Sequence, residues 1–170
     1  RIGVDNIVAT GSNATASAAW TQAEVVSVGG YVTVEVGLDT PASAVIYTCT
    51  LEGDGSLTVA DQISVDLAAG VSITQTALYA NAGEYVGIFP GSATLNYQAT
   101  NPEGRVIWST TGVPTTSTAK TLSSSFRFEM AFTVKSGILG DMTQIVSGAD
   151  ANFAGAILQA ADNAGATDAT

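Results

Sequence analysis

The sequence contains no histidine and only one cysteine, Cys49. Without histidine there can be no Ser-His-Asp triad, no Cys-His pair and no histidine metal site, which removes most hydrolytic machinery. A single cysteine cannot form an internal disulfide, and within the apolar run that surrounds it Cys49 is expected to be a small buried hydrophobe. The sequence therefore predicts a protein that is not an enzyme, needs no cofactor and is not held together by disulfides.

Positive charge is also scarce, with 5 Lys and Arg against 15 Asp and Glu and a net charge of −10. No Lys or Arg lies between Arg1 and Arg105 or after Lys135. Nucleic acids and anionic membranes bind clustered basic residues, so neither is an expected partner. No apolar run approaches the roughly 18 residues that span a bilayer, and no signal-peptide pattern opens the chain. An acidic, lysine-poor surface suits solubility in a salty or extracellular setting.

What the sequence does contain is a hydrophobic share of 46% and 18 glycines in 170 residues, enough for one domain with a substantial core. Residues 31–38 and 126–134 alternate between apolar and polar side chains, as half-buried strands do. Between residues 2 and 110, about ten such segments are separated by Gly, Pro, Asn and Asp turns, and no helical pattern interrupts them. This pattern predicts an all-β fold, an antiparallel β-sandwich.

Three parts of the chain are expected. Residues 1–23 are predicted to form an N-terminal strand and an extended arm, and residues 24–136 the β-sandwich, with a strand over residues 24–28. Residues 137–170 are predicted to be a C-terminal tail or linker with a short helix over residues 149–161. The polar segment 111–125 is interpreted as an exposed functional loop or a flexible connection.

Carboxylate side chains are the candidates for acid–base catalysis and for metal binding. Acid–base pairs in glycoside hydrolysis need two of them, and the candidates are Glu35, Glu84, Glu103 and Glu129. Each occupies a turn or the outward position of a strand, which favours a solvated surface charge. Four others lie around one predicted hairpin and are of the type that binds Ca²⁺: Glu52, Asp54, Asp61 and Asp66. Their spacing does not match an EF-hand loop and Asp is common in turns, so no metal site is predicted.

Aromatic side chains that stack on sugar rings are the usual means of carbohydrate binding by sandwiches. Trp108 shares its strand face with aliphatic residues and is predicted to lie in the core, whereas Trp20 follows a loop and is expected to be exposed or at an interface. The predicted ligand-binding residues are these two tryptophans, one tyrosine and three residues of the polar segment. They are Trp20, Tyr97, Trp108, Thr115, Thr116 and Lys120.

Three segments carry a resemblance to a known family: GDGSLTVADQISVDLAAGVS (53–72), NAGEYVGIFPGSATLNYQA (81–99) and FRFEMAFTVKSG (126–137). Together they resemble a β-sandwich module of phage tail fibres and tailspikes, of the kind that precedes SGNH-type esterase domains. The resemblance implies a jelly-roll-like sandwich that acts as a spacer or carbohydrate-binding unit in a trimeric virion appendage. The esterase itself is missing, because the chain has no Gly-Asp-Ser nucleophile motif and no histidine, so no functional residue of the family can be placed on it.

The leading hypothesis is therefore a non-catalytic virion structural or receptor-binding module, acting by contact with its own copies, with neighbouring virion proteins or with host glycan. A homo-oligomer is expected, with a trimer favoured. One alternative is a capsid or head-decoration protein, or an extracellular filament subunit, whose termini reach neighbouring subunits. Another is a free-standing carbohydrate-binding lectin.

Overall fold

A computed structural model describes residues 1–4, 11–12 and 18–135 of the chain. These residues belong to one compact unit, Arg1–Lys135. The tail predicted for residues 137–170, including its helix over residues 149–161, lies outside the described residues.

Every regular element in the described residues is a β-strand. The strands are β1 (Ile2–Val4), β2 (Gly11–Ser12), β3 (Ala18–Gln22), β4 (Gly30–Leu38), β5 (Ala42–Leu51), β6 (Leu57–Leu67), β7 (Gly70–Ala80), β8 (Tyr85–Phe89), β9 (Asn96–Gln98), β10 (Ile107–Thr111), β11 (Thr121–Ser123), β12 (Arg127–Phe128) and β13 (Met130–Lys135). They form a four-stranded sheet (β1-β13-β4-β7), a six-stranded sheet (β11-β10-β3-β8-β5-β6) and a three-stranded sheet (β12-β9-β2), with antiparallel pairing throughout. The prediction of an all-β antiparallel sandwich is confirmed.

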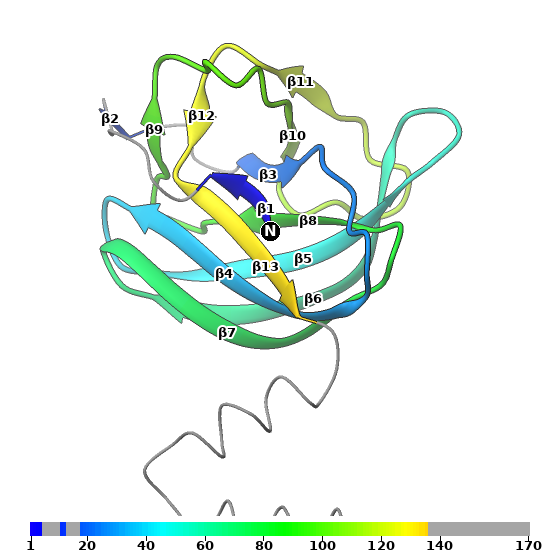
Figure 1. The fold of residues 1–170 in the computed structure, drawn as a ribbon, viewed down its shortest axis with the longest axis horizontal. Helices are drawn as coiled ribbons and strands as arrows, with labels where there is room; N and C mark the ends of the chain where they lie inside the picture. Colours follow the sequence, from blue (N-terminus) through cyan, green and yellow to red (C-terminus); the bar gives the residue numbers. More distant parts are fainter. Residues whose placement is uncertain (5–10, 13–17, 136–170) are drawn as a thin grey trace, which may run out of the picture. The chain divides into compact units, whose positions relative to one another are not determined.

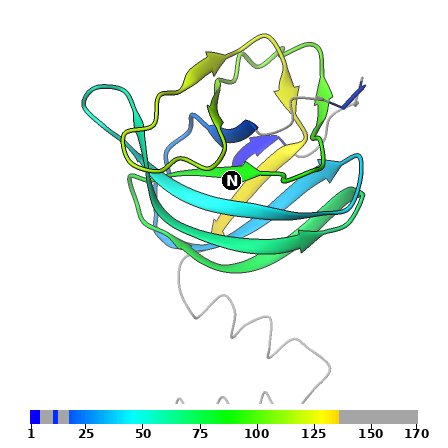
Figure 2. The same cartoon turned by 180° about the vertical axis from the view of Figure 1, so that it is seen from behind.

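The main core lies between the four-stranded and six-stranded sheets (Figure 1). From the four-stranded sheet, Val34 of β4 and Phe132 of β13 point inward, and from the six-stranded sheet Ile46 of β5 and Ile88 of β8 meet them. All four side chains are fully buried. Figure 2 shows the same arrangement from behind, with the long strands β5 and β6 in front. The period-two alternation expected over residues 31–38 is observed, because β4 buries one face in this core.

The described N-terminal residues contribute one strand to each of the three sheets. The N-terminal strand predicted within residues 1–23 is present as β1, whereas β3 stands in place of part of the predicted extended arm. Ile2 of β1 pairs with Phe132 at one edge of the four-stranded sheet. Strand β3 lies between β10 and β8 inside the six-stranded sheet, and all its residues are buried. Strand β3 contains two alanines, which are depleted in strands, and no alternation of burial, so pairing with two neighbouring strands, which the local sequence does not reveal, determines its structure.

Residues 24–28, predicted as a strand, form an irregular connection from β3 to β4. Val26 anchors it, because its amide donates to the Glu84 carbonyl (2.8 Å) and its carbonyl accepts from the Gly83 amide (2.9 Å). These backbone bonds tie the connection to a turn rather than to a neighbouring strand. The predicted strand over residues 24–28 is therefore wrong.

The closing segment 126–134 is split at Glu129 instead of forming one alternating strand. Strand β12 pairs with β9 of the small sheet, and β13 pairs with β4 of the four-stranded sheet. At the break, the Glu129 amide donates to the Asn96 carbonyl (3.0 Å) and the Glu129 carbonyl accepts from the Gly37 amide (2.9 Å). The Glu129 side chain is buried and its carboxylate accepts from Asn96 Nδ2 at 3.1 Å. The outward, solvated position predicted for Glu129 is thus wrong.

The six-stranded sheet is buried on its outer face as well. Along β5, Ile46 faces the main core, whereas Tyr47 and Cys49 belong to a second hydrophobic cluster with Trp108. Residues 112–120 cover this cluster. Thr118 exchanges two backbone hydrogen bonds with Leu57 of β6 (2.7 and 2.9 Å). The polar segment predicted as an exposed loop or flexible connection therefore includes a docked cover over a sheet face.

Candidate functional site

Trp20 lies in the core and not on the surface. Only 7% of it is exposed, and its ring centroid lies 4.5 Å from that of Phe128 and 6.0 Å from that of Phe126. Tyr97, which is half-buried on β9, joins the same aromatic cluster at 6.2 Å from Phe126. The predicted exposure of Trp20 is wrong because β3 is an interior strand whose Trp20 side chain points between the sheets.

Trp108 is 8% exposed, which confirms its predicted core position. Its ring packs 4.8 Å from that of Tyr85 within the second cluster. Lys120 lies over the same ring, with Nζ 4.8 Å from the centroid, and donates a short hydrogen bond to the Gly55 carbonyl. A cation held over an aromatic face is attracted by the π system and occupies the surface on which a sugar would stack. The fold brings Trp108 and Lys120 together, but Lys120 packs on the ring and leaves no open ring face for a ligand.

The tip of the covering segment presents the two predicted threonines. Thr115 and Thr116 are exposed. The Thr115 amide donates to Thr118 Oγ1 (2.9 Å), and the Ser117 amide donates to Thr58 Oγ1 of β6 (3.0 Å). Ser117 has a φ of +49°, which is uncommon for a residue other than glycine. The tip is thus a fixed turn that displays hydroxyl groups on a convex loop.

The four carboxylates of the β5–β6 hairpin are each engaged locally or separately exposed. Asp54 accepts from the Ser56 hydroxyl (2.6 Å) and amide (2.9 Å), and these hydrogen bonds lower the pKa of Asp54. Glu52 accepts from Thr50 (2.9 Å), and Asp61 from the Gln62 amide (2.8 Å). Asp66 is exposed near the end of β6. Among the described residues, no group of three or more such side chains is arranged to hold a metal ion.

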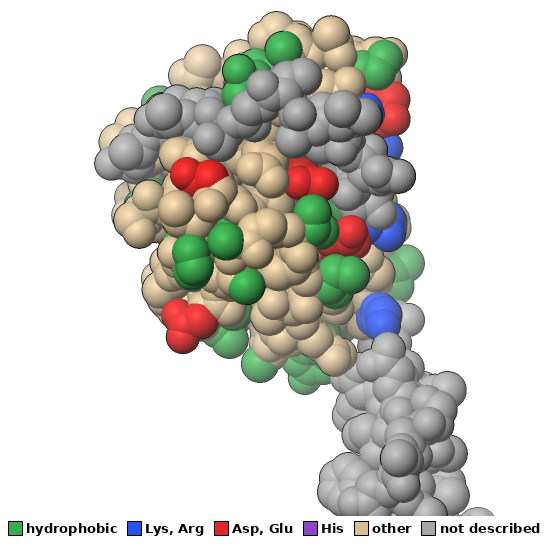
Figure 3. All heavy atoms as spheres, turned by 90° about the vertical axis from the view of Figure 1, so that its left-hand side faces the viewer, with side chains coloured by type: hydrophobic (Ala, Val, Ile, Leu, Met, Phe, Trp, Pro, Cys, Tyr) green, Lys and Arg blue, Asp and Glu red, His purple; other side chains and the backbone are tan. Residues whose placement is uncertain are grey.

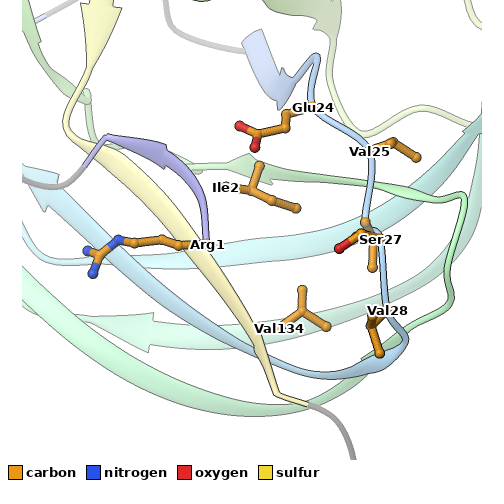
Figure 4. Close-up of a pocket in the computed structure, with 8 residues that line it drawn as sticks. Arg1, Ile2, Glu24, Val25, Ser27, Val28 and Val134 are labelled. Atoms are coloured by element: carbon orange, nitrogen blue, oxygen red, sulfur yellow. The ribbon is translucent and has the colours of Figure 1, made fainter.

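A hollow of about 260 Å³ lies between β1, β13 and the 24–28 connection. Figure 4 shows Ile2, Val28 and Val134 around it, while the Arg1 side chain extends away. The polar groups at its rim bind elsewhere: Arg1 donates to Glu35 at 2.7 Å, and Glu24 accepts from Arg105 at 3.0 Å. The lining mixes polar and apolar groups, and its two charged side chains are held in these ion pairs, so the hollow specifies no ligand.

The most unusual surface in the described structure is on β7, which forms an edge of the four-stranded sheet. We define the outer row as the side chains of β7 that point away from the sandwich, all of them exposed. They are Val71, Ile73, Gln75, Ala77 and Tyr79. Beside the row, Tyr31 of β4 packs edge-on against Tyr79 with ring centroids 5.3 Å apart. None of the predicted site residues belongs to this row.

The inward side chains at the start of β7 are hydroxyl residues. Ser72 and Thr74 are half-buried and Thr76 is buried. Thr76 Oγ1 donates to the Val32 carbonyl (2.8 Å) and accepts from the Leu78 amide (3.2 Å), where the register between β4 and β7 shifts. Ser72 Oγ is buried without a hydrogen-bond partner among the described residues. A signal that could have pointed to this face is the alternation of Val71 and Ile73 with hydroxyl residues, but alternation alone does not say which side faces the core.

None of the elements in the described residues is a helix with the length and apolar character required to cross a membrane. Comparison of the chain with protein-family models, with curated proteins and with solved structures found no match.

Proposed function

We propose that this chain is a non-catalytic structural or receptor-binding module of a virion, of the kind found in phage tail fibres and spikes, and that it acts by surface contact. The observation that carries the proposal is the outer row of β7, an exposed apolar strip on an extended sheet edge. Exposed apolar patches of this kind favour contact with another macromolecule over chemistry on a small substrate. The resemblance of residues 53–72, 81–99 and 126–137 to tail-fibre modules supplies the virion setting.

The contacts of the glutamates considered for glycoside hydrolysis support the non-catalytic part of the proposal. Glu35 binds Arg1 (2.7 Å) and Glu103 binds Arg105 (2.6 Å). Glu84 accepts two hydrogen bonds from Asn81 (2.9 Å each), and Glu129 accepts from Asn96 (3.1 Å). Each carboxylate thus has a structural partner in its own neighbourhood. Glycosidases instead bring two carboxyl groups together across one substrate cleft.

The partners that fit this proposal are copies of the same chain, neighbouring virion proteins and host glycan. Size-exclusion chromatography with light scattering on the intact chain tests the assembly part. We expect a homo-oligomer of defined stoichiometry, a trimer if the module belongs to a fibre. A strictly monomeric chain at all concentrations would count against a fibre or spike.

Glycan-array binding tests the receptor part separately. Binding by the assembled chain supports a receptor-binding module, and binding by a monomer points to a free-standing lectin. Because Trp20 and Trp108 are buried, loss of binding in Trp20→Ala or Trp108→Ala carries meaning only if the variant is shown to be folded.

A further inference from the structure

The first half of β7 is inverted with respect to the sandwich it belongs to. From residue 71 to residue 76 the aliphatic side chains Val71 and Ile73 face outward, while the hydroxyl residues Ser72, Thr74 and Thr76 face inward. An antiparallel sheet with one solvated face ordinarily shows the opposite pattern, apolar inward and polar outward.

Both halves of this inversion cost free energy in an isolated chain. Ile73 is 68% exposed, so most of the hydrophobic gain from burying its side chain is not realised. Inward, Ser72 Oγ is buried without a hydrogen-bond partner among the described residues, and an unsatisfied buried hydroxyl is destabilising. Burial of the outer face of β7 when the protein functions would recover the first of these costs.

We propose that the outer face of the four-stranded sheet, centred on Val71, Ile73 and Tyr79 of β7, packs against a second copy of this chain. The inference rests on the proposed function, because a module that assembles with its own copies requires such a surface. It goes further by naming the face and its residues.

Charge favours a second copy at this face. Strands β4, β7 and β13 contain two charged residues, Glu35 and Lys135, and β7 itself has none. Arg1 pairs with Glu35 at 2.7 Å, so the negative charge on this face is neutralised within the chain. The chain as a whole has a net charge of −10, and two copies repel each other wherever acidic surfaces meet. Contact through the outer row brings together uncharged surfaces.

The outer faces of the two sheets differ in how far other residues cover them, and the difference points to the outer face of the four-stranded sheet. Part of the outer face of the six-stranded sheet is covered, because Val113 and Lys120 pack on the cluster around Trp108. The outer face of the four-stranded sheet has no comparable cover among the described residues, and Ile73 and Val71 stay exposed. Figure 3 views the side on which the β6–β7 turn lies, where hydrophobic side chains stand among polar surface with several Asp and Glu side chains between them.

The size of the face sets the scale of the contact. A row from Val71 to Tyr79 is about 26 Å long at about 3.3 Å per residue, and the three gaps of about 4.8 Å between four strands span about 14 Å. The flat footprint is at most roughly 370 Å², and protruding side chains add area to it, toward the roughly 800 Å² that each partner buries in a specific interface. The register shift opposite Tyr31 and Thr33 interrupts β7 as a template for strand addition, so we infer face packing.

Light scattering on matched lysine variants tests the inference. Ile73→Lys places a charge in the centre of the face, and Leu122→Lys places the same charge on β11 of the other sheet, at a residue of similar exposure (63%). We expect the wild type and Leu122→Lys to assemble and Ile73→Lys to elute as a folded monomer of 17.1 kDa. Ile73→Thr, which keeps a β-branched side chain, serves if the lysine variant does not fold and should also weaken assembly.

The outcomes separate the inference from the proposed function. If the wild type and both Ile73 variants assemble equally, the named face is wrong while self-assembly stands. If the wild type is monomeric throughout, the assembly part of the proposed function fails together with the inference. If a monomeric wild type binds glycan and Ile73→Lys loses that binding, the face has an occupant other than a second copy, which also overturns the inference.

Discussion

Buried hydroxyl groups in the sandwich differ in whether they are satisfied. Thr76 Oγ1 has a backbone partner on each side, Val32 at 2.8 Å and Leu78 at 3.2 Å. Thr48 Oγ1 is fully buried on β5 and has no hydrogen-bond partner among the described residues. Two threonines in the same fold therefore contribute to stability with opposite signs, because an unsatisfied buried hydroxyl keeps its desolvation cost.

Substituting each threonine by valine, which has a similar volume, separates these contributions. Thr76→Val should lower the free energy of unfolding by about 2 kcal/mol, because two buried backbone groups lose their partner. Thr48→Val should leave it unchanged or raise it by up to about 1 kcal/mol, because no hydrogen bond is lost. Urea unfolding of both variants measures the difference, and equal losses in the two would contradict these assignments.

Cys49 gives a pH-dependent contribution. Burial raises the pKa of the Cys49 thiol from 9.0 to about 12, with a smaller raising effect from Glu84 and a lowering one from a hydrogen bond with Thr21. The folded pKa lies above the unfolded one, so the neutral thiol stabilises the fold below about pH 9. That contribution is lost as the pH rises from about 9 toward about 12.

Between these values the free energy of unfolding should fall by about 1.4 kcal/mol per pH unit on account of this thiol. Cys49→Ala should be less stable than the wild type in the neutral range but should lose less stability as the pH rises above about 9. Denaturant unfolding in a series of alkaline buffers measures both slopes. Parallel pH profiles for the two proteins would show that Cys49 does not titrate in this way.

At the scale of elements, residues 112–120 act as a cover for the second hydrophobic cluster. Lys120 fixes this cover by bonding the Gly55 carbonyl and lying over the Trp108 ring. Lys120→Ala should expose Trp108 and increase the quenching of tryptophan fluorescence by acrylamide, with secondary structure unchanged. Lys135→Ala removes the same charge from β13 and should leave the quenching at the wild-type level. Equal quenching in the wild type and both variants would mean that Lys120 does not cover Trp108.

The strand pattern was predictable wherever alternation and turn chemistry agree, as in β4 and in the β5–β6 hairpin with its Asp54-Gly55 turn. It failed for β3, whose Ala and Thr residues acquire strand geometry from their neighbours. It also failed at Glu129, where the chain leaves one sheet and enters another. Pairing between distant segments decides both cases, and local sequence does not encode it.

The candidate surface was harder to predict than the fold. The sequence directed attention to Trp20 and Trp108, which the fold buries, because large aromatic rings suit cores as well as platforms. The outer row was not among the predicted site residues, although Val71 and Ile73 alternate with hydroxyl residues in the sequence. Such a pattern places the apolar face inward by default, and only the position of β7 in the sheet shows that part of it faces outward.

For the whole molecule, net charge and surface contact work against each other. Copies that each have a charge of −10 repel one another, and salt screens that repulsion over a distance of about 10 Å at 0.1 M. Because the proposed contact is apolar, assembly should strengthen when NaCl rises from about 0.05 M to about 0.5 M. Light scattering across this range should show a rising oligomer fraction. A falling fraction would indicate that ion pairs, not the outer row, hold the copies together.

Thiol labelling at position 73 tests the central claim most directly. Cys49 is buried, so Ile73→Cys adds a single accessible thiol to the chain, and Leu122→Cys provides the matched control on the other sheet. The rate of reaction with a maleimide reagent reports the solvent access of each position as the protein concentration is raised through the range of assembly. We predict that labelling at position 73 slows as the chain assembles while labelling at position 122 keeps its rate. Equal labelling at position 73 in the monomeric and assembled chain would contradict the account.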